Sequence, residues 1–190
     1  MNILNLLDFE NVKENVFLGI RPHKDDGAAT IDYLDLEVYM YIWMDYDSDH
    51  TLEGIINNDV IKMWDVPVDV VFNAAKANSL KKVHSFWLSN IITGADPDHN
   101  HMSLTSRDYK NGAVAMCFKN VLLEKAKEFN TSLLYIVPMS IHDVMLANPA
   151  DMTIEEVNEL IRDINGTTNP DEVLSDHVYI LNTITGEIIF

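Results

Sequence analysis

The sequence has little of what disulfide-bonded, membrane-spanning or phosphate-binding proteins need. The single cysteine, Cys117, cannot form an intramolecular disulfide, and such cysteine usage is typical of cytosolic proteins. No apolar run is long enough for a signal peptide or a membrane span. The seven glycines are spread singly, which argues against a glycine-rich phosphate loop. We therefore predict a cytoplasmic protein with no membrane partner and no nucleotide bound through such a loop.

Basic residues are also scarce, because 13 Lys and Arg stand against 30 Asp and Glu and give a formal net charge of −17. A chain of this charge repels phosphate backbones and anionic membranes, so we predict no nucleic-acid partner. The acidity has three interpretations: it keeps a soluble domain soluble, it forms a face for a basic partner, or it imitates nucleic acid.

The 190 residues are expected to form a single α+β domain over residues 1–190, a mostly antiparallel sheet with helices packed on it. Apolar residues that alternate along the chain predict strands, and apolar residues three or four apart, with capping residues, predict helices. Residues 8–20 fit either a short helix or a strand. The predicted strands are 33–44, 53–56 and 133–137, with an extended piece over 81–94 and hairpins of 102–106 with 112–116 and of 176–181 with 187–190; the predicted helices are 58–64, 67–78, 118–129 and 154–164. Residues 141–146 fit either a short helix or an extended continuation, of which we favour the second.

Polar residues follow the apolar strand at 133–137, where Pro138 halts it. Ser140, His142 and Asp143 are the residue types of a hydrolase relay, in which a histidine takes the proton of the serine and an acid orients that histidine. Residues this close on one segment do not readily align, and the chain has no Gly-x-Ser-x-Gly sequence. The alternative is that they form hydrogen bonds that fasten the turn after Pro138.

A second polar step, Asp176 and His177, precedes the C-terminal strand. If the two strands are neighbours, His142, Asp143, Asp176 and His177 converge at one end of the sheet. This is our candidate for a catalytic or ligand site; the alternative is that the residues cap turns.

Two other segments contain residues that bind metals or act as nucleophiles. Residues 45–50 resemble the start of a calcium loop but lack its glycine and its closing glutamate. Cys117 is either a nucleophile with His142 or His177 as base, or a small buried apolar residue. The richest set of potential metal ligands is Asp96, Asp98, His99 and His101. Because its His-x-His pair is expected in a loop, we interpret this set as a solvated turn and predict no resident metal or cofactor.

Several segments along the chain carry a family resemblance: Leu7-Asp-Phe-Glu-Asn-Val-Lys13, Tyr33-Leu-Asp-Leu36, Met63-Trp-Asp-Val66, Asn111-Gly-Ala113, Leu134-Tyr-Ile-Val-Pro-Met-Ser-Ile-His-Asp-Val144 and Glu172-Val-Leu-Ser-Asp-His-Val-Tyr179. In this order they resemble a bacterial family of unknown function, DUF5688. The resemblance implies an uncharacterised cytosolic protein and supplies no activity or catalytic residue. Met139 stands where the family has Ser and Asp143 where it has Glu, so a role that needs either is not carried over. The resemblance also implies that this chain is the C-terminal part of a longer architecture.

No set of residues meets the geometric demands of catalysis on sequence grounds. We therefore expect a non-enzymatic interaction or regulatory module, whose partner is another protein or a second copy of the chain. The alternative is a hydrolase-like or metal-assisted enzyme that uses the His and Asp residues at one end of the sheet.

Overall fold

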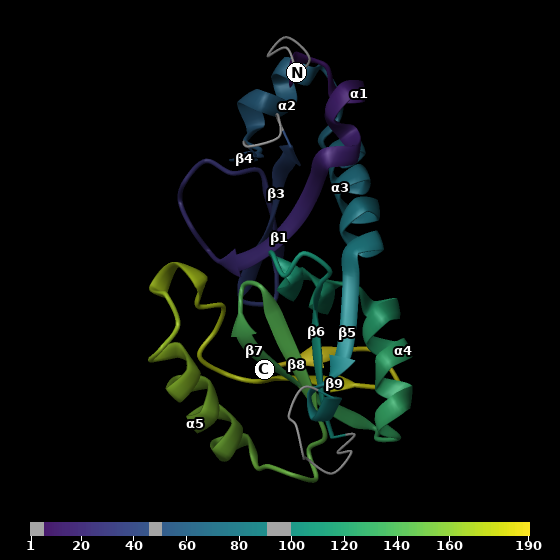
Figure 1. Ribbon diagram of the computed structural model, residues 1–190, viewed down its shortest axis with the longest axis vertical. Coiled ribbons are helices and arrows are strands. Elements are labelled where there is room, and N and C mark those ends of the chain that lie inside the picture. The colour runs from purple at the N-terminus through teal and green to yellow at the C-terminus, as the bar shows by residue number, and fades with distance from the viewer. Residues whose placement is uncertain (1–5, 46–50, 91–99) are drawn as a thin grey trace. The chain divides into compact units, whose positions relative to one another are not determined.

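The structure is a computed structural model that describes residues 6–45, 51–90 and 100–190 (Figure 1). The chain divides into two compact units, unit 1 (Met1–Lys82) and unit 2 (Val83–Phe190). Both contain an antiparallel sheet with helices, which confirms the α+β prediction. That the two units together make one domain stays a prediction.

The sheet of unit 1 is built around β3 (Leu36–Asp45). β1 (Val16–Pro22) pairs with one edge of β3, and β2 (Thr30–Tyr33) and β4 (Thr51–Ile55) pair with the other edge in succession. The helices of this unit are α1 (Phe9–Val12), η2 (Lys13–Asn15), α2 (Asn58–Trp64) and α3 (Val68–Lys82).

The single long strand predicted for residues 33–44 is wrong at its start. Tyr33 ends β2 and pairs with Leu36, so a two-residue turn separates β2 from β3. Leu34 adopts φ 57° there, although glycine is the usual residue in this conformation. The apolar alternation continues through the turn, and no Gly or Asn marks it in the sequence.

Helix α3 supports β1 through polar side chains that apolar periodicity does not detect. The backbone N–H of Leu18 donates to Ser79 Oγ at 2.8 Å, and Asn78 Nδ2 donates to the carbonyls of Lys13 and Val16. Because Ser79 and Asn78 are buried and satisfy backbone groups of the sheet edge, α3 continues to Lys82, four residues beyond its predicted end.

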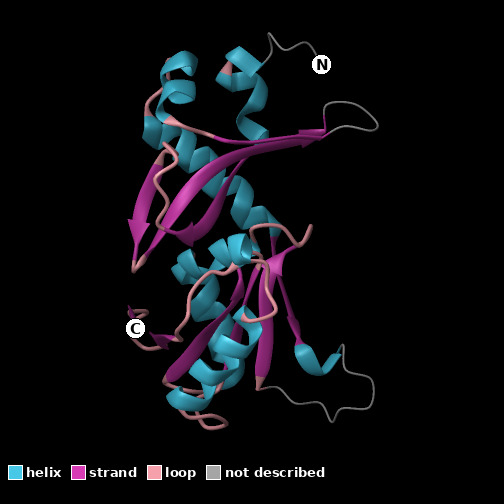
Figure 2. Ribbon diagram, turned by 90° about the vertical axis from the view of Figure 1, so that its left-hand side faces the viewer, coloured by secondary structure: helices cyan, strands magenta, loops and turns pink. Residues whose placement is uncertain are grey.

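Unit 2 contains a six-stranded antiparallel sheet of order β10-β9-β7-β8-β6-β5. Figures 1 and 2 show α4 and α5 on opposite sides of this sheet. On one face, Val157 and Ile161 of α5 pack against Tyr135, Val137 and Met145. The strands are β5 (Val83–Trp87), β6 (His101–Ser106), β7 (Leu133–Ser140), β8 (Asp143–Ala147), β9 (Tyr179–Asn182) and β10 (Ile188–Ile189); the helices are η3 (Leu88–Asn90), η4 (Gly112–Cys117), α4 (Lys119–Phe129), α5 (Ile154–Asn165) and η5 (Pro170–Glu172).

Most of the elements predicted in this unit are confirmed, including the C-terminal hairpin, but the hairpin around Asn111 is wrong. β6 pairs with β5 and β8, and the segment after Gly112 forms the 3₁₀-helix η4. Asn111 turns the chain with φ 49°. The turn signal was therefore real, but the apolar residues after it fill the core as a helix. Periodicity cannot separate these alternatives in so short an apolar run.

Helix α5 begins with the predicted capping box. The Thr153 hydroxyl accepts from the Glu156 N–H, and the Glu156 carboxylate accepts from the Thr153 N–H. The Thr153 hydroxyl also donates to the Glu156 carboxylate at 2.9 Å. The hydrogen bonds that this carboxylate accepts from the Thr153 N–H and hydroxyl lower the pKa of Glu156. Within the described residues, no helix combines the length and the apolar character needed to cross a membrane.

Replacing Thr153 by alanine is expected to lower the free energy of unfolding by about 1 kcal/mol, because the Glu156 N–H loses the hydroxyl that accepts its hydrogen bond. Urea denaturation followed by circular dichroism measures the change. Thr153→Ser, which keeps the hydroxyl, is the matched control and should unfold at nearly the wild-type urea midpoint. An alanine variant as stable as the wild type would contradict a stabilising role of the cap.

Candidate functional site

The predicted residues Ser140, His142 and Asp143 lie in the turn between β7 and β8, which we call the Ser140 turn (residues 140–143). The Ser140 hydroxyl donates to Asp143 Oδ1 at 2.7 Å and accepts from the His142 N–H at 3.0 Å. The strand register shifts between Pro138 and Ser140, so the hydroxyl points back into the turn. The hydroxyl proton of Ser140 therefore points at the Asp143 carboxylate and not at the His142 imidazole.

The His142 side chain connects the Ser140 turn to two other segments. Its Nδ1 accepts from the backbone N–H of Asn111 at 3.1 Å, which requires an unprotonated Nδ1. Its Nε2 lies 3.7 Å from Glu172 Oε1. The backbone carbonyl of His142 accepts from the Thr105 hydroxyl at 2.8 Å. His142 thus holds together the end of β6, the start of η4 and η5.

This geometry differs from a serine hydrolase relay. In such a relay the histidine accepts the serine proton, and the acid faces the other ring nitrogen. Here Ser140 bonds directly to Asp143, and both ring nitrogens of His142 face other groups. The hydrogen bonds fit the alternative of a fastened turn, and a catalytic role for these residues stays a prediction.

Asp176 and His177 precede β9, which pairs with β7 over residues that include Ile136 and Tyr179. β7 and β9 are therefore neighbours, as a shared site of His142, Asp143, Asp176 and His177 would require. The His177 ring stacks on Phe190 with centroids 5.2 Å apart and meets Tyr179 edge-on at 4.7 Å. Asp176 is exposed. The described contacts give His177 an aromatic environment, and a shared site with His142 stays a prediction.

The predicted metal ligands Asp96, Asp98 and His99 lie outside the described residues, as do residues 46–50 of the calcium-like segment. His101 begins β6, where it pairs with Ala147. Among residues 6–45, 51–90 and 100–190, no three His, Cys, Asp or Glu side chains gather as a metal site would require. Cys117 ends η4 and is half-buried.

Sequence reasoning missed a cluster of charged side chains in unit 1, of which Glu37 is buried. Arg21 Nε donates to Glu37 at 2.8 Å, and its two terminal nitrogens donate to Asp26 at 2.7 and 2.8 Å. Its guanidinium lies 4.6 Å from the centroid of the Tyr39 ring. The hydrogen bonds from Arg21 lower the pKa of Asp26. The sequence does not reveal this ion pair, because only the pairing of β1 with β3 places Arg21 opposite Glu37.

Burial raises the pKa of Tyr39 to about 12. In the unfolded chain a tyrosine ionises near its usual pKa of about 10. The stabilisation from the neutral phenol is thus complete below pH 10 and is lost as the pH rises toward 12. We expect a loss of about 2 to 3 kcal/mol across this interval that Tyr39→Phe does not show. Parallel urea titrations of both proteins measure it, and identical slopes against pH would contradict it.

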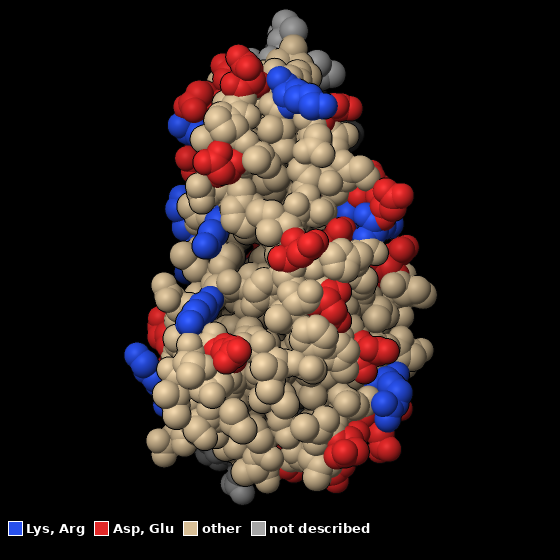
Figure 3. Space-filling model, turned by 180° about the vertical axis from the view of Figure 1, so that it is seen from behind, with Lys and Arg blue, Asp and Glu red and all other residues tan. Residues whose placement is uncertain are grey.

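On the face shown in Figure 3, acidic and basic side chains are interspersed among neutral ones. Two pockets of unit 2, of about 630 and 440 Å³, are lined by other residues than the Ser140 turn, Asp176 or His177. Neither pocket therefore supports the predicted site.

A family model described as a family of unknown function (DUF5688) matches residues 1–182 of the chain. No curated protein and no solved structure matches the chain.

Proposed function

Because this chain belongs to DUF5688, a family of unknown function, we propose from its own geometry that it is a non-enzymatic cytosolic module of a bacterial cell, which acts by binding a protein partner. One observation carries the proposal. The polar atoms of Ser140, His142 and Asp143 are directed at one another, at the Asn111 backbone N–H and at the Glu172 carboxylate. Groups used in this way stabilise a turn and are poorly placed to attack a substrate.

A sheet edge in unit 1 supports partner binding. In the part of the chain that the structure describes, β2 and β4 each pair with β3 and with no other named strand. Each carries an exposed isoleucine, Ile31 at 49% and Ile55 at 45%. A strand edge with exposed apolar side chains can pair with an extended segment of another protein.

The test begins with capture of binding proteins by the immobilised full chain and continues with calorimetric titration of each purified candidate. We expect a partner whose affinity falls at least about tenfold with Ile31→Lys and Ile55→Lys, because a buried ammonium is costly at such an interface. Ile154→Lys, which makes the same change at an exposed position of α5, is the matched control and should leave the affinity unchanged.

The same proteins test the enzymatic alternative. If a divalent metal or a hydrolase substrate analogue raises the melting temperature of the wild type, and His142→Ala with His177→Ala abolishes the rise, the hydrolase-like or metal-assisted reading replaces the proposal. Failure of every purified candidate to bind would also count against the module.

A further inference from the structure

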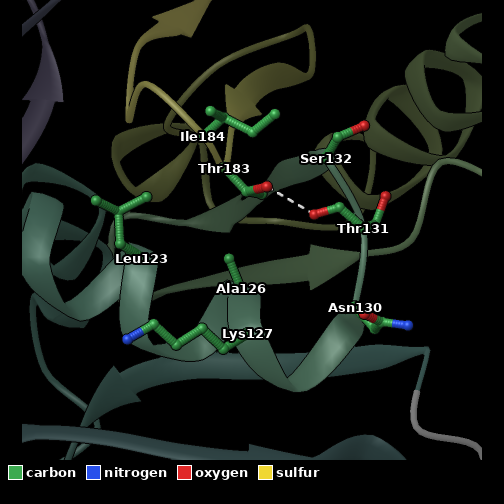
Figure 4. A pocket seen from close by; sticks show the side chains of 8 residues that line it. All are labelled: Leu123, Ala126, Lys127, Asn130, Thr131, Ser132, Thr183 and Ile184. Atoms are coloured by element: carbon green, nitrogen blue, oxygen red, sulfur yellow. Dashed lines mark hydrogen bonds between the residues drawn. The ribbon is translucent and has the colours of Figure 1, made fainter.

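A pocket of unit 2 between α4 and the segment after β9 is a second possible site, independent of the sheet edge in unit 1. It has a volume of about 630 Å³, within the range of pockets that hold small ligands. In Figure 4 the side chains from α4 lie on one side of it, those that follow β9 lie on the opposite side, and the segment leading into β7 closes one end. Its lining consists of Leu123, Ala126, Lys127, Asn130, Thr131, Ser132, Thr183 and Ile184.

The walls of this pocket are held in place by the fold. Asn130 ends α4 with φ 49°, which turns the chain directly into Thr131 and Ser132. The Thr183 hydroxyl donates to the Thr131 carbonyl at 2.6 Å, and the Thr183 N–H donates to the Ser132 carbonyl at 3.0 Å. These bonds connect the segment before β7 with the segment after β9, so the fold itself fixes this side of the pocket.

The charge of the lining is opposite to that of the chain. Lys127 is its one charged residue, although acids outnumber bases 30 to 13 in the sequence. Within residues 6–45, 51–90 and 100–190, Lys127 makes no ion pair or hydrogen bond, whereas Lys125 on the same helix pairs with Glu128 at 3.2 Å. The Lys127 ammonium is therefore available to an anion.

The remaining lining offers an apolar surface beside that ammonium. Leu123 and Ala126 lie on α4, and the Lys127 side chain runs back along the helix toward Leu123 (Figure 4). Ile184 faces them from the other side and is 81% exposed. An isoleucine so exposed at the mouth of a pocket gains most when an apolar group covers it.

We infer that this pocket binds a small organic anion with an apolar body, such as a medium-chain carboxylate. The carboxylate pairs with Lys127, and the apolar body lies between Leu123, Ala126 and Ile184. The inference goes beyond partner binding and does not rest on it.

The test is an amide NMR titration of the full chain at about 0.15 M salt, where the repulsion from distant acids is screened. The probes are hexanoate, hexylamine, which carries the opposite charge on the same chain, and acetate, which lacks the apolar body. We expect saturable shifts at Ala126, Lys127, Thr131 and Ile184 with hexanoate, at a Kd in the millimolar range typical of a fragment of this size. Hexylamine and acetate should give at least about tenfold weaker binding.

Two variants test the contacts without touching the core. Lys127→Gln should weaken hexanoate binding about tenfold, and Ile184→Ser about fivefold, both with wild-type melting temperatures. Lys76→Gln, at an exposed lysine of α3, is the control and should leave the Kd unchanged. Equal binding of hexanoate and hexylamine, unsaturable shifts, or an unchanged Kd for Lys127→Gln would overturn the inference. None of these results bears on the Ile31 and Ile55 edge, so the two proposals can fail separately.

Discussion

Replacing Gly112 by alanine is expected to lower the free energy of unfolding by about 3 kcal/mol, because a side chain has no room there. A Cβ at this position would lie 2.2 Å from the Ser106 nitrogen and 2.5 Å from the His142 carbonyl oxygen. Both contacts are with backbone atoms, and the same His142 carbonyl accepts from the Thr105 hydroxyl. Relief of the clash must therefore separate the Ser140 turn from the end of β6.

Urea denaturation followed by tryptophan fluorescence measures this effect. The matched control is Gly166→Ala at the end of α5, where a Cβ would make ordinary contacts of 3.4 and 3.5 Å and φ is −63°. That variant should change the stability by less than about 1 kcal/mol. If both substitutions cost the same, the close approach at Gly112 is not what stabilises this part of unit 2.

Replacing Arg21 by methionine is expected to cost about 3 to 5 kcal/mol at neutral pH. The side chain of Glu37 is 5% exposed, so it would remain as a buried carboxylate without its guanidinium. The apolar stem of methionine keeps much of the contact with the Tyr39 ring, so the loss reports the charge.

The double variant Arg21→Met, Glu37→Gln separates the two causes of this loss. It should recover a large part of the stability, because no unpaired buried charge remains. Lys62→Met is the surface control: Lys62 and Asp59 form an exposed pair, with 76% and 88% of their side chains accessible, so the change should stay within about 0.5 kcal/mol. A double variant no more stable than Arg21→Met alone would show that Arg21 acts through packing and not through its charge.

The sequence predicted the elements whose signals are local. The capping box at Thr153, the apolar stripe of α5 and the apolar run of β7 each depend on residues a few positions apart, and all three are confirmed. The turn at Asn111 was likewise recognised, but its consequence was not. Gly112 closely approaches the backbone of His142, which is distant in sequence, and no local pattern reveals that contact.

For the candidate site, too, the sequence predicted the local feature and not the tertiary contacts. The sequence indicated that Ser140, His142 and Asp143 end a buried strand, and this is where the structure places them. It could not show the direction of each hydrogen bond. The Ser140 proton points to Asp143 because of the register shift in β7, and His142 accepts from Asn111 because η4 begins beside it.

By itself, the sequence determined the α+β class, the acidic charge, the family and most elements of unit 2, because propensity, periodicity and capping act over short distances along the chain. Tertiary structure alone decided the division of the strands between two sheets, the pairing of Arg21 with Glu37, and the pocket around Lys127. Each of these depends on contacts between segments far apart in sequence, whose partners are selected by packing and by the burial of charge.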